Sequence, residues 1–395
     1  MTSEPRTLRR IATGAAVAVS VGAALALPAS GVGAVAAIQD DVLTAGPAEN
    51  IPQRLDLVKA TKAKVARFDI LWSLVAKTRP ANPTDPNDPA YDWSRADQVL
   101  EGFAAAGIKP IVSVYSTPDW AVSGTPRDYE SEYNPNAPVP ADFADFYTAA
   151  ATRYNGFFVR PDDGVTLPRV RLWEVWNEPN LAGFLQKGGR NSLSVYKSLL
   201  KAAYPAIKAG NRNSIVIGGV GGPRSSTDSK GTGAKTWLTG LVGDKSVKFD
   251  AYSQHIYPSQ GPKYYTKSYA RAFPSWLSLD YIYKQLDRKK KGMKLFVTEA
   301  GYTTAKTDFR KVKVSFAQQN LYLKQLFALP AVKSPRLAAI VWFNLQDNLH
   351  TFPDGSITGW PGGLLKVDGS KKPAYASFVA IARKPIPAAL RATFK

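Results

Sequence analysis

Short apolar runs alternate with longer amphipathic segments along the chain from about residue 35 onward. The apolar runs are bounded by glycine, proline, asparagine or aspartate, as is typical of buried strands, and the segments between them repeat their apolar positions with the helical period. The pattern predicts strands at residues 35–38, 64–70, 108–115, 170–178, 214–220, 249–256, 294–298 and 337–343. It predicts helices at residues 51–58, 96–106, 143–154, 196–209, 277–288, 314–329 and 374–382.

This order of elements predicts the fold class. Eight strands alternate with helices and none needs a hairpin partner, which favours parallel pairing because parallel neighbours require a crossover between them. We therefore expect an α/β fold, a (β/α)8 TIM barrel, as a single domain over residues 31–395. A doubly wound sheet is the alternative, but the glycine-rich phosphate loop expected after its first strand is missing.

Residues 1–30 differ in composition from the rest of the chain. Three arginines precede an apolar run from Ile11 to Leu27, and small residues follow it. This layout is typical of a secretory signal peptide, so we expect a secreted protein. An uncleaved membrane anchor is the alternative, but the run is short and rich in alanine. No later run is long and apolar enough to span a bilayer, so we expect no stable membrane span after signal removal.

Composition narrows the possible chemistry. Cysteine is absent, which excludes disulfides and thiolate metal sites, and two histidines, His255 and His350, are few for a zinc site. The formal net charge of +20 favours anionic partners such as acidic polysaccharides, although general surface solvation explains it as well. We expect no nucleic-acid partner, because no nucleic-acid-binding motif is recognisable.

Two glutamates lie at the ends of predicted strands and are the candidate catalytic residues. Glu178 is followed by Pro179, which we expect to end the fourth strand by removing a backbone donor, and Glu299 closes the seventh strand. In a closed barrel the carboxyl ends of the strands meet at one rim, so the two carboxylates can face each other. A protonated carboxyl group and an ionised one on either side of a sugar are what glycosidic cleavage requires.

Other polar and aromatic residues lie at or just beyond predicted strand ends. Arg67 can hold a catalytic carboxylate, but it can also neutralise Glu174, which shares strand parity with Glu178. The other candidates either line a sugar site or fill the core. They are the polar residues Asn177, His255 and Tyr257 and the aromatic residues Trp342, Trp120, Trp72 and Tyr302, whose flat faces suit the C–H face of a pyranose.

Two motifs resemble those of clan A of the glycoside hydrolases. The sequence Trp-Asn-Glu-Pro-Asn at residues 176–180 resembles the acid/base motif of the clan, and Phe-Val-Thr-Glu-Ala-Gly-Tyr at 296–302 resembles its nucleophile motif. The layout is most similar to family 39, which includes β-xylosidases, iduronidases and bacterial exopolysaccharide hydrolases, with family 5 as second choice. The resemblance covers about residues 33–382.

The resemblance implies a role for each matched residue. Glu178 would be the acid/base, Glu299 the nucleophile and Asn177 the partner of the sugar 2-hydroxyl. Arg67 and Tyr257 would steady the nucleophile. The mechanism would be retaining, with the carboxyl groups about 5–5.5 Å apart and a covalent glycosyl-enzyme.

The resemblance also implies that His255 and Trp342 line the first sugar subsite, and it implies neither a cofactor nor a metal. The alternative function is a non-catalytic carbohydrate- or cell-wall-binding protein on a barrel scaffold, because fold alone does not prove activity. Both carboxylates and Asn177 are retained, which favours the enzyme. The sequence leaves the sugar, the linkage and the oligomeric state open.

Overall fold

The computed structural model of the chain describes residues 33–395, apart from 130–132, 187–190, 309 and 355. The signal peptide expected at residues 1–30 lies outside the described residues. Within the described part, no helix has the length and apolar character needed to cross a membrane.

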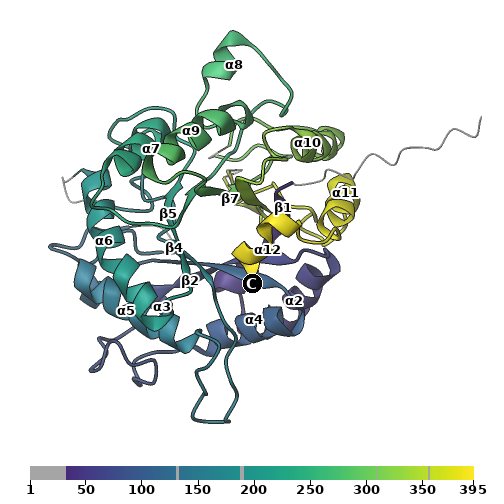
Figure 1. Cartoon of the computed structure of the whole chain (residues 1–395). Helices are drawn as coiled ribbons and strands as arrows, with labels where there is room; N and C mark the ends of the chain where they lie inside the picture. The colour runs from purple at the N-terminus through teal and green to yellow at the C-terminus, as the bar shows by residue number, and fades with distance from the viewer. Residues whose placement is uncertain (1–32, 130–132, 187–190, 309, 355) are drawn as a thin grey trace, which may run out of the picture. The chain divides into compact units, whose positions relative to one another are not determined.

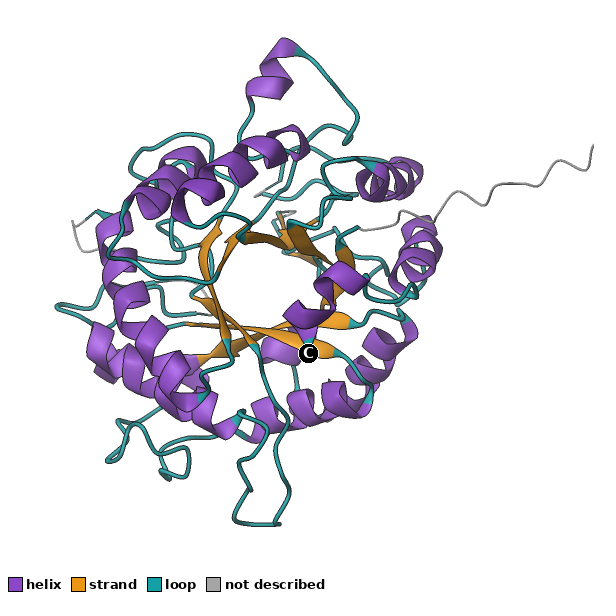
Figure 2. Cartoon of the chain, in the orientation of Figure 1, coloured by secondary structure: helices purple, strands orange, loops and turns teal. Residues whose placement is uncertain are grey.

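Eight parallel strands close into a barrel in which each strand pairs with its neighbours in sequence and β1 pairs with β8. Figure 2 shows the ring of strands inside a ring of helices. The sequence-based prediction of a (β/α)8 barrel is therefore confirmed. The strands are β1 (Val35–Gln39), β2 (Val65–Leu71), β3 (Lys109–Tyr115), β4 (Leu172–Val175), β5 (Ile215–Gly221), β6 (Ala251–Gln254), β7 (Lys294–Ala300) and β8 (Leu337–Trp342).

The outer helices include one that the sequence analysis missed. The longer helices are α2 (Ile51–Ala60), α4 (Ser94–Ala105), α5 (Pro140–Arg153), α6 (Ser192–Gly210), α7 (Ala234–Gly243), α9 (Leu279–Lys289), α10 (Phe316–Ala328) and α11 (Pro373–Ala382). Helix α7 was not predicted, because glycine at both of its ends and a glycine inside it weaken the helical signal. It buries Trp237 and Leu241. Shorter elements include α1 (Asp41–Ala45), α3 (Trp72–Val75), α8 (Lys267–Arg271) and the antiparallel pair β9 (His350–Thr351) and β10 (Ile357–Thr358).

Strand β4 ends earlier than the sequence predicted. It stops at Val175, so Pro179 does not terminate it, and Glu178 lies in the turn that follows. Trp176 and Glu178 both have positive φ angles, 71° and 42°, which L-residues rarely adopt. The backbone therefore leaves the sheet before the proline, and the turn rather than the strand orients the Glu178 side chain.

The short helix α12 (Ala388–Phe394) closes the amino-terminal end of the barrel. Figure 1 shows it lying across the mouth of the strand ring. Its Leu390 and Phe394 join an apolar cluster with inward residues from the starts of the strands, and the ring of Phe394 lies 6.3 Å from that of Phe296. The barrel interior is thus packed at this end.

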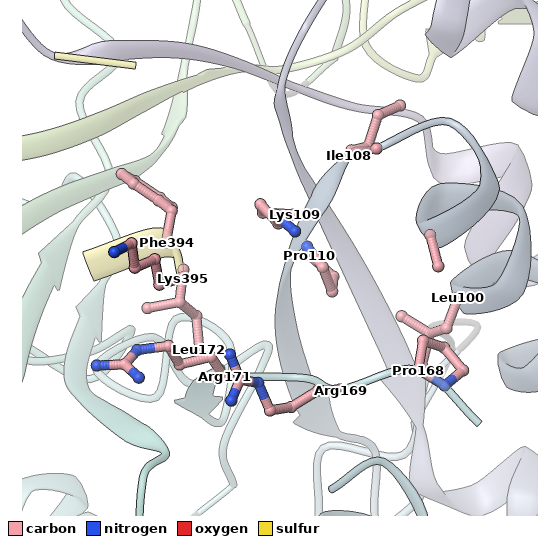
Figure 3. Close-up of a pocket in the computed structure, with 12 residues that line it drawn as sticks. Leu100, Ile108, Lys109, Pro110, Pro168, Arg169, Arg171, Leu172, Phe394 and Lys395 are labelled. Carbon is pink, nitrogen blue, oxygen red and sulfur yellow. The ribbon is translucent and has the colours of Figure 1, made fainter. Parts of the chain in front are cut away.

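A cavity of about 320 Å³ lies beside α12 at the same end of the barrel. Its lining includes Lys109 and Leu172, the first residues of their strands, together with Arg171 and Phe394 (Figure 3). Because Glu178 and Glu299 follow or end their strands, this cavity is at the opposite end of the barrel from both carboxylates. It is not the substrate site predicted from the sequence.

Candidate active site

The two candidate catalytic carboxylates meet at the carboxyl-terminal rim of the barrel. Glu178 follows β4, and Glu299 is the next-to-last residue of β7. His255 lies between them, because its Nδ1 atom is 2.8 Å from Glu178 Oε1 and 3.4 Å from Glu299 Oε2. One oxygen from each carboxylate and one ring nitrogen all lie within 4.8 Å of one another. The carboxylates therefore face each other across a short gap.

Arg67 joins the nucleophile candidate to the barrel interior. Its Nη1 donates to Glu299 Oε1 at 2.9 Å, and its Nε donates to Glu174 Oε2 at 2.7 Å. Arg67 therefore both holds the candidate nucleophile and neutralises Glu174, the two roles considered from the sequence. Its Nη2 donates to Asn177 Oδ1 at 2.8 Å, which turns the amide NH₂ of Asn177 away from the guanidinium. Arg67 is 1% exposed, so these bonds compensate for a buried charge.

The two carboxyl groups have different surroundings. Burial raises the pKa of Glu178 to about 7, opposed by the positive charges of Arg67 and Arg310. Burial also raises the pKa of Glu299, and the positive charge of Arg67 counteracts this rise. Glu299 accepts hydrogen bonds on both oxygens, from Arg67 and from the Tyr257 hydroxyl at 2.8 Å. Donors to both oxygens favour the ionised form of Glu299, whereas Glu178 can hold its proton near neutral pH.

His255 is buried beneath the two carboxylates. Burial lowers the pKa of its imidazole to about 4, so the ring is neutral at pH 7. Its Nε2 lies 3.2 Å from the Thr298 hydroxyl, which is hydrogen-bonded in turn to Ser253. With Thr298 donating to Nε2, the Nδ1–H donates to Glu178 Oε1, and no hydrogen bond from the residues that the structure describes reaches the other oxygen of that carboxyl group.

Close backbone approach fixes the position of Glu178. Gly222, directly after β5, has no room for a side chain, because an added Cβ would lie 2.9 Å from Glu178 Cδ. Asn180 holds this glycine in place. Its Oδ1 accepts from Gly222 N at 2.6 Å, and its Nδ2 donates to the carbonyls of Gly222 and Thr232. The last residue of the Trp-Asn-Glu-Pro-Asn motif thus has a structural role.

Three of the four predicted aromatic platform residues are buried, which corrects the sequence-based expectation. Trp72 is fully buried against Trp120 and Phe143, and Tyr302 is buried with its hydroxyl accepting from Trp276. Trp342, the last residue of β8, is 1% exposed and donates from Nε1 to the Gly362 carbonyl. These three rings cannot offer a face to a sugar.

Trp120 is half-buried but partly covered. The guanidinium of Arg79 lies 4.6 Å from the ring centroid of Trp120, and the indole Nε1 donates to the Ala76 carbonyl at 2.8 Å. Arg79 therefore covers part of the ring face that Trp120 could offer to a sugar.

The partly exposed aromatic surface near the carboxylates comes from residues that the sequence analysis did not select. Phe343 and Trp360 are half-buried, with ring centroids 5.6 Å apart, and both pack edge-on against Tyr257, the residue that donates to Glu299. Phe343 directly follows Trp342, so the sequence analysis selected the residue next to the partly exposed ring. Trp360 comes from the loop after β8, whose path the sequence does not show.

Glu178, His255 and Glu299 also have the spacing of a metal-binding group. Both oxygens of Glu299 already accept hydrogen bonds, and the Arg67 cation lies 2.9 Å from one of them. A second cation there would be repelled by the guanidinium. The donor set therefore fits a pair of carboxyl groups better than a metal centre.

A match to a family model identifies the chain. Residues 47–317, more than half of the chain, match the model of "Glycosyl hydrolases family 39". The chain belongs to family 39 of the glycoside hydrolases. The match contains both motifs singled out in the sequence and decides between families 39 and 5.

A curated relative of this family 39 chain is a β-xylosidase of Geobacillus stearothermophilus, 25% identical over 184 residues. The alignment covers 46% of this chain and 33% of that enzyme, so the chain spans about a third of the curated relative's length.

Solved structures show the same fold. A monomeric β-xylosidase from Caulobacter crescentus superposes with a TM-score of 0.61 at 20% identity, covering 88% of this chain and 67% of the other. A family 39 glycoside hydrolase from Bacteroides cellulosilyticus gives a TM-score of 0.60 at 18% identity, with 90% and 64% covered. At these identities the likeness supports the barrel and not a substrate.

Gly222→Ala tests whether close packing positions Glu178. The added methyl group would displace the Glu178 carboxyl group, so we expect kcat to fall by about 10- to 100-fold while the fold is retained. The measurements are steady-state kinetics on an aryl glycoside and far-UV circular dichroism. Gly243→Ala is the matched control, because its Cβ would meet nothing within 4 Å. Equal activity of the two variants would contradict this role.

Proposed function

We propose that this chain is a retaining glycoside hydrolase that cleaves O-glycosidic bonds of a polysaccharide or oligosaccharide by double displacement. One observation carries the proposal. Oxygens of Glu178 and Glu299 lie within 4.8 Å of each other, and only Glu299 has hydrogen-bond donors on both oxygens. A short separation leaves no room for a water between the carboxylate and the sugar, which favours direct attack.

In the first step Glu299 attacks the anomeric carbon while Glu178 gives its proton to the leaving oxygen. The C–O bond to the leaving group breaks, and an ester bond forms between Glu299 and the sugar. Arg67 and Tyr257 keep Glu299 ionised and fix the direction of its oxygens. The Nδ1–H of His255 holds Glu178 Oε1, so the other oxygen carries the transferred proton.

In the second step Glu178, now ionised, takes a proton from water. The water oxygen attacks the anomeric carbon, the ester bond breaks, and Glu299 leaves as a carboxylate. Glu178 and Glu299 thus return to their starting protonation states, and the sugar keeps its anomeric configuration.

A non-catalytic carbohydrate-binding protein is the alternative. It would need neither a glutamate with a pKa near 7 nor a second one with donors to both oxygens. Burying such groups costs stability, and binding sugar hydroxyls does not require it.

We also propose export, because residues 1–30 have the composition of a signal peptide. The protein recovered from the culture medium should then begin near residue 31, which amino-terminal sequencing checks.

The high positive charge supports an anionic substrate, at least in the parts of the polymer beyond the cleaved sugar.

Replacing each glutamate by glutamine separates the two roles. Glu299→Gln should lower kcat by about a thousandfold or more on every aryl glycoside, because the amide cannot form the ester intermediate. Glu178→Gln should lower kcat by about 10²- to 10⁴-fold for poor leaving groups and far less for a dinitrophenyl glycoside, which leaves without a proton. Initial rates and NMR detection of the first product anomer are the measurements.

Asp368→Asn, an exposed carboxylate, is the control and should leave all rates unchanged. Unchanged turnover in Glu299→Gln would contradict the nucleophile assignment. A product of inverted configuration would contradict double displacement.

The pH dependence follows from the raised pKa of Glu178. Glu178 must be protonated to act as the acid, so kcat/KM should fall about tenfold per pH unit once the pH exceeds its pKa of about 7. The acid limb should reflect protonation of Glu299. In Glu178→Gln, the residual activity on a dinitrophenyl glycoside should lose the alkaline limb. An unchanged alkaline limb in that variant would assign it to another group.

A further inference from the structure

The connection between β6 and α9 projects from the barrel. It covers residues 255–278, contains the short helix α8, and extends beyond the ring of helices (Figure 1). In a barrel of this kind the connections from strand to helix lie at the end where the strands finish, which is the end that carries Glu178 and Glu299. We call residues 263–272 of this connection the α8 projection.

The α8 projection exposes two neighbouring aromatic rings. Tyr265 is 71% exposed and Tyr264 is 45% exposed. Rings this exposed contribute little to folding, because apolar area stabilises the folded state only when it is buried. The ring of Tyr264 packs edge-on against that of Tyr269, which is buried, with the centroids 5.8 Å apart. The projection therefore presents aromatic surface to solvent from a supported position.

Positive charge flanks these rings. Lys263 directly precedes them, and Lys267 and Arg271 lie one helical turn apart on α8. All three side chains are exposed, and none forms an ion pair or a hydrogen bond with the residues that the structure describes. No acidic residue occurs between Gln254 and Asp280. The segment itself therefore supplies no carboxylate to neutralise the three cations.

The connection is anchored to the barrel at its base. Trp276 is buried, and its Nε1 donates to the Tyr302 hydroxyl at 3.1 Å. The same hydroxyl donates to the Gln260 carbonyl at 3.3 Å. At the start of α8, the Thr266 hydroxyl accepts from the backbone nitrogen of Tyr269 at 3.0 Å. These contacts hold the projection at a defined place beside the rim.

The position of the connection relates it to the substrate. It begins with His255 and Tyr257, which contact Glu178 and Glu299 respectively. A polymer with one sugar between these two carboxyl groups would continue across the same end of the barrel. The α8 projection stands at that end, so it can contact sugars beyond the cleaved one.

We propose that the α8 projection is a second binding surface, which holds an acidic polysaccharide on the catalytic face of the barrel. The rings of Tyr264 and Tyr265 offer flat apolar faces to the C–H faces of sugar rings. Lys263, Lys267 and Arg271 pair with carboxylate groups of the polymer. The inference rests on the proposed function and names the class of its substrate, a polymer with carboxylate-bearing sugars outside the cleaved position.

Other anionic partners fit this position less well. A membrane or a nucleic acid bound at the projection would cover the end of the barrel at which Glu178 and Glu299 lie, and it would hinder the approach of a polymer. A polysaccharide held at the same place brings its own neighbouring sugars to the two carboxyl groups. The position of the projection therefore favours the polysaccharide.

The test measures binding of the full chain by isothermal titration calorimetry. The ligands are polygalacturonate as the acidic polymer, hydroxyethyl cellulose as the neutral one, vesicles of phosphatidylglycerol, and single-stranded polythymidylate. The wild-type protein should bind polygalacturonate at least about tenfold more tightly than the neutral polymer in about 0.1 M NaCl. This ratio should shrink in about 0.5 M NaCl, because salt screens exposed charges.

Two sets of substitutions separate the rings from the charges. Tyr264→Ala combined with Tyr265→Ala should weaken binding of polygalacturonate about fivefold or more at both salt concentrations, because apolar contact is not screened. Lys263→Gln, Lys267→Gln and Arg271→Gln together should weaken it about tenfold or more in about 0.1 M NaCl and reduce its dependence on salt. Circular dichroism and thermal unfolding check that each variant is folded.

Each set has a matched control. Phe157→Ala removes an 82% exposed ring from the connection between α5 and β4, at the opposite end of the barrel. The charge control removes three lysines that are exposed elsewhere, by Lys201→Gln, Lys324→Gln and Lys384→Gln. Both controls should weaken binding by less than about twofold, because the charges act over only about 10 Å in about 0.1 M NaCl.

The inference is overturned if the two projection variants bind polygalacturonate as their controls do, or if wild type binds the neutral polymer as tightly. Tighter binding of vesicles or polythymidylate, lost in the same variants, would overturn it in favour of that partner. Should the tyrosine variant not fold, the charge variant and its control decide.

Turnover of aryl glycosides by the wild-type protein is measured in parallel. Turnover without binding at the projection would overturn this inference and leave the hydrolase function intact. Binding that depends on the projection, without cleavage of any glycoside, would contradict the hydrolase function and retain the binding surface.

Discussion

The buried guanidinium of Arg67 is the interaction on which the rest of the site depends. It donates to Glu174, Glu299, Asn177 and Gln39 and lies 3.3 Å from Asp69. A buried cation of this kind is stable only when its donors are paired, and buried carboxylates need the same cation. The partners come from β1, β2, β4 and β7 and from the turn after β4, so only the closed barrel brings all of them to one guanidinium.

Glu178 and Glu299 are the same type of residue, and their different neighbours give them different roles. Glu299 is held by donors on both oxygens, whereas Glu178 meets a neutral histidine and a glycine backbone. The positive φ of Glu178 stores local strain that the hydrogen bonds of Asn180 to Gly222 support. Burial raises the pKa of Glu178 to about 7, whereas donors on both oxygens favour the ionised form of Glu299.

Periodicity predicted the order and type of the barrel elements, because buried parallel strands and amphipathic helices leave patterns over short stretches of sequence. It failed where local signals conflict with packing. Helix α7 is rich in glycine, and α12 is a short terminal helix stabilised by burial of Leu390 and Phe394 at the barrel end. Strand β4 ends at Val175 because the backbone turns there, although Pro179 gave the stronger sequence signal.

The sequence by itself determined the family, the barrel and the two glutamates at its rim, because strand order and motif position are properties of the chain read locally. Only the tertiary structure decided which side chains are exposed and which share a partner. Trp72 and Trp342 are buried while Phe343 and Trp360 are not, and Gln39 holds Asp69 next to Arg67. Contacts of this kind join residues that are distant in sequence, and their geometry exists only once the eight strands have closed into a ring.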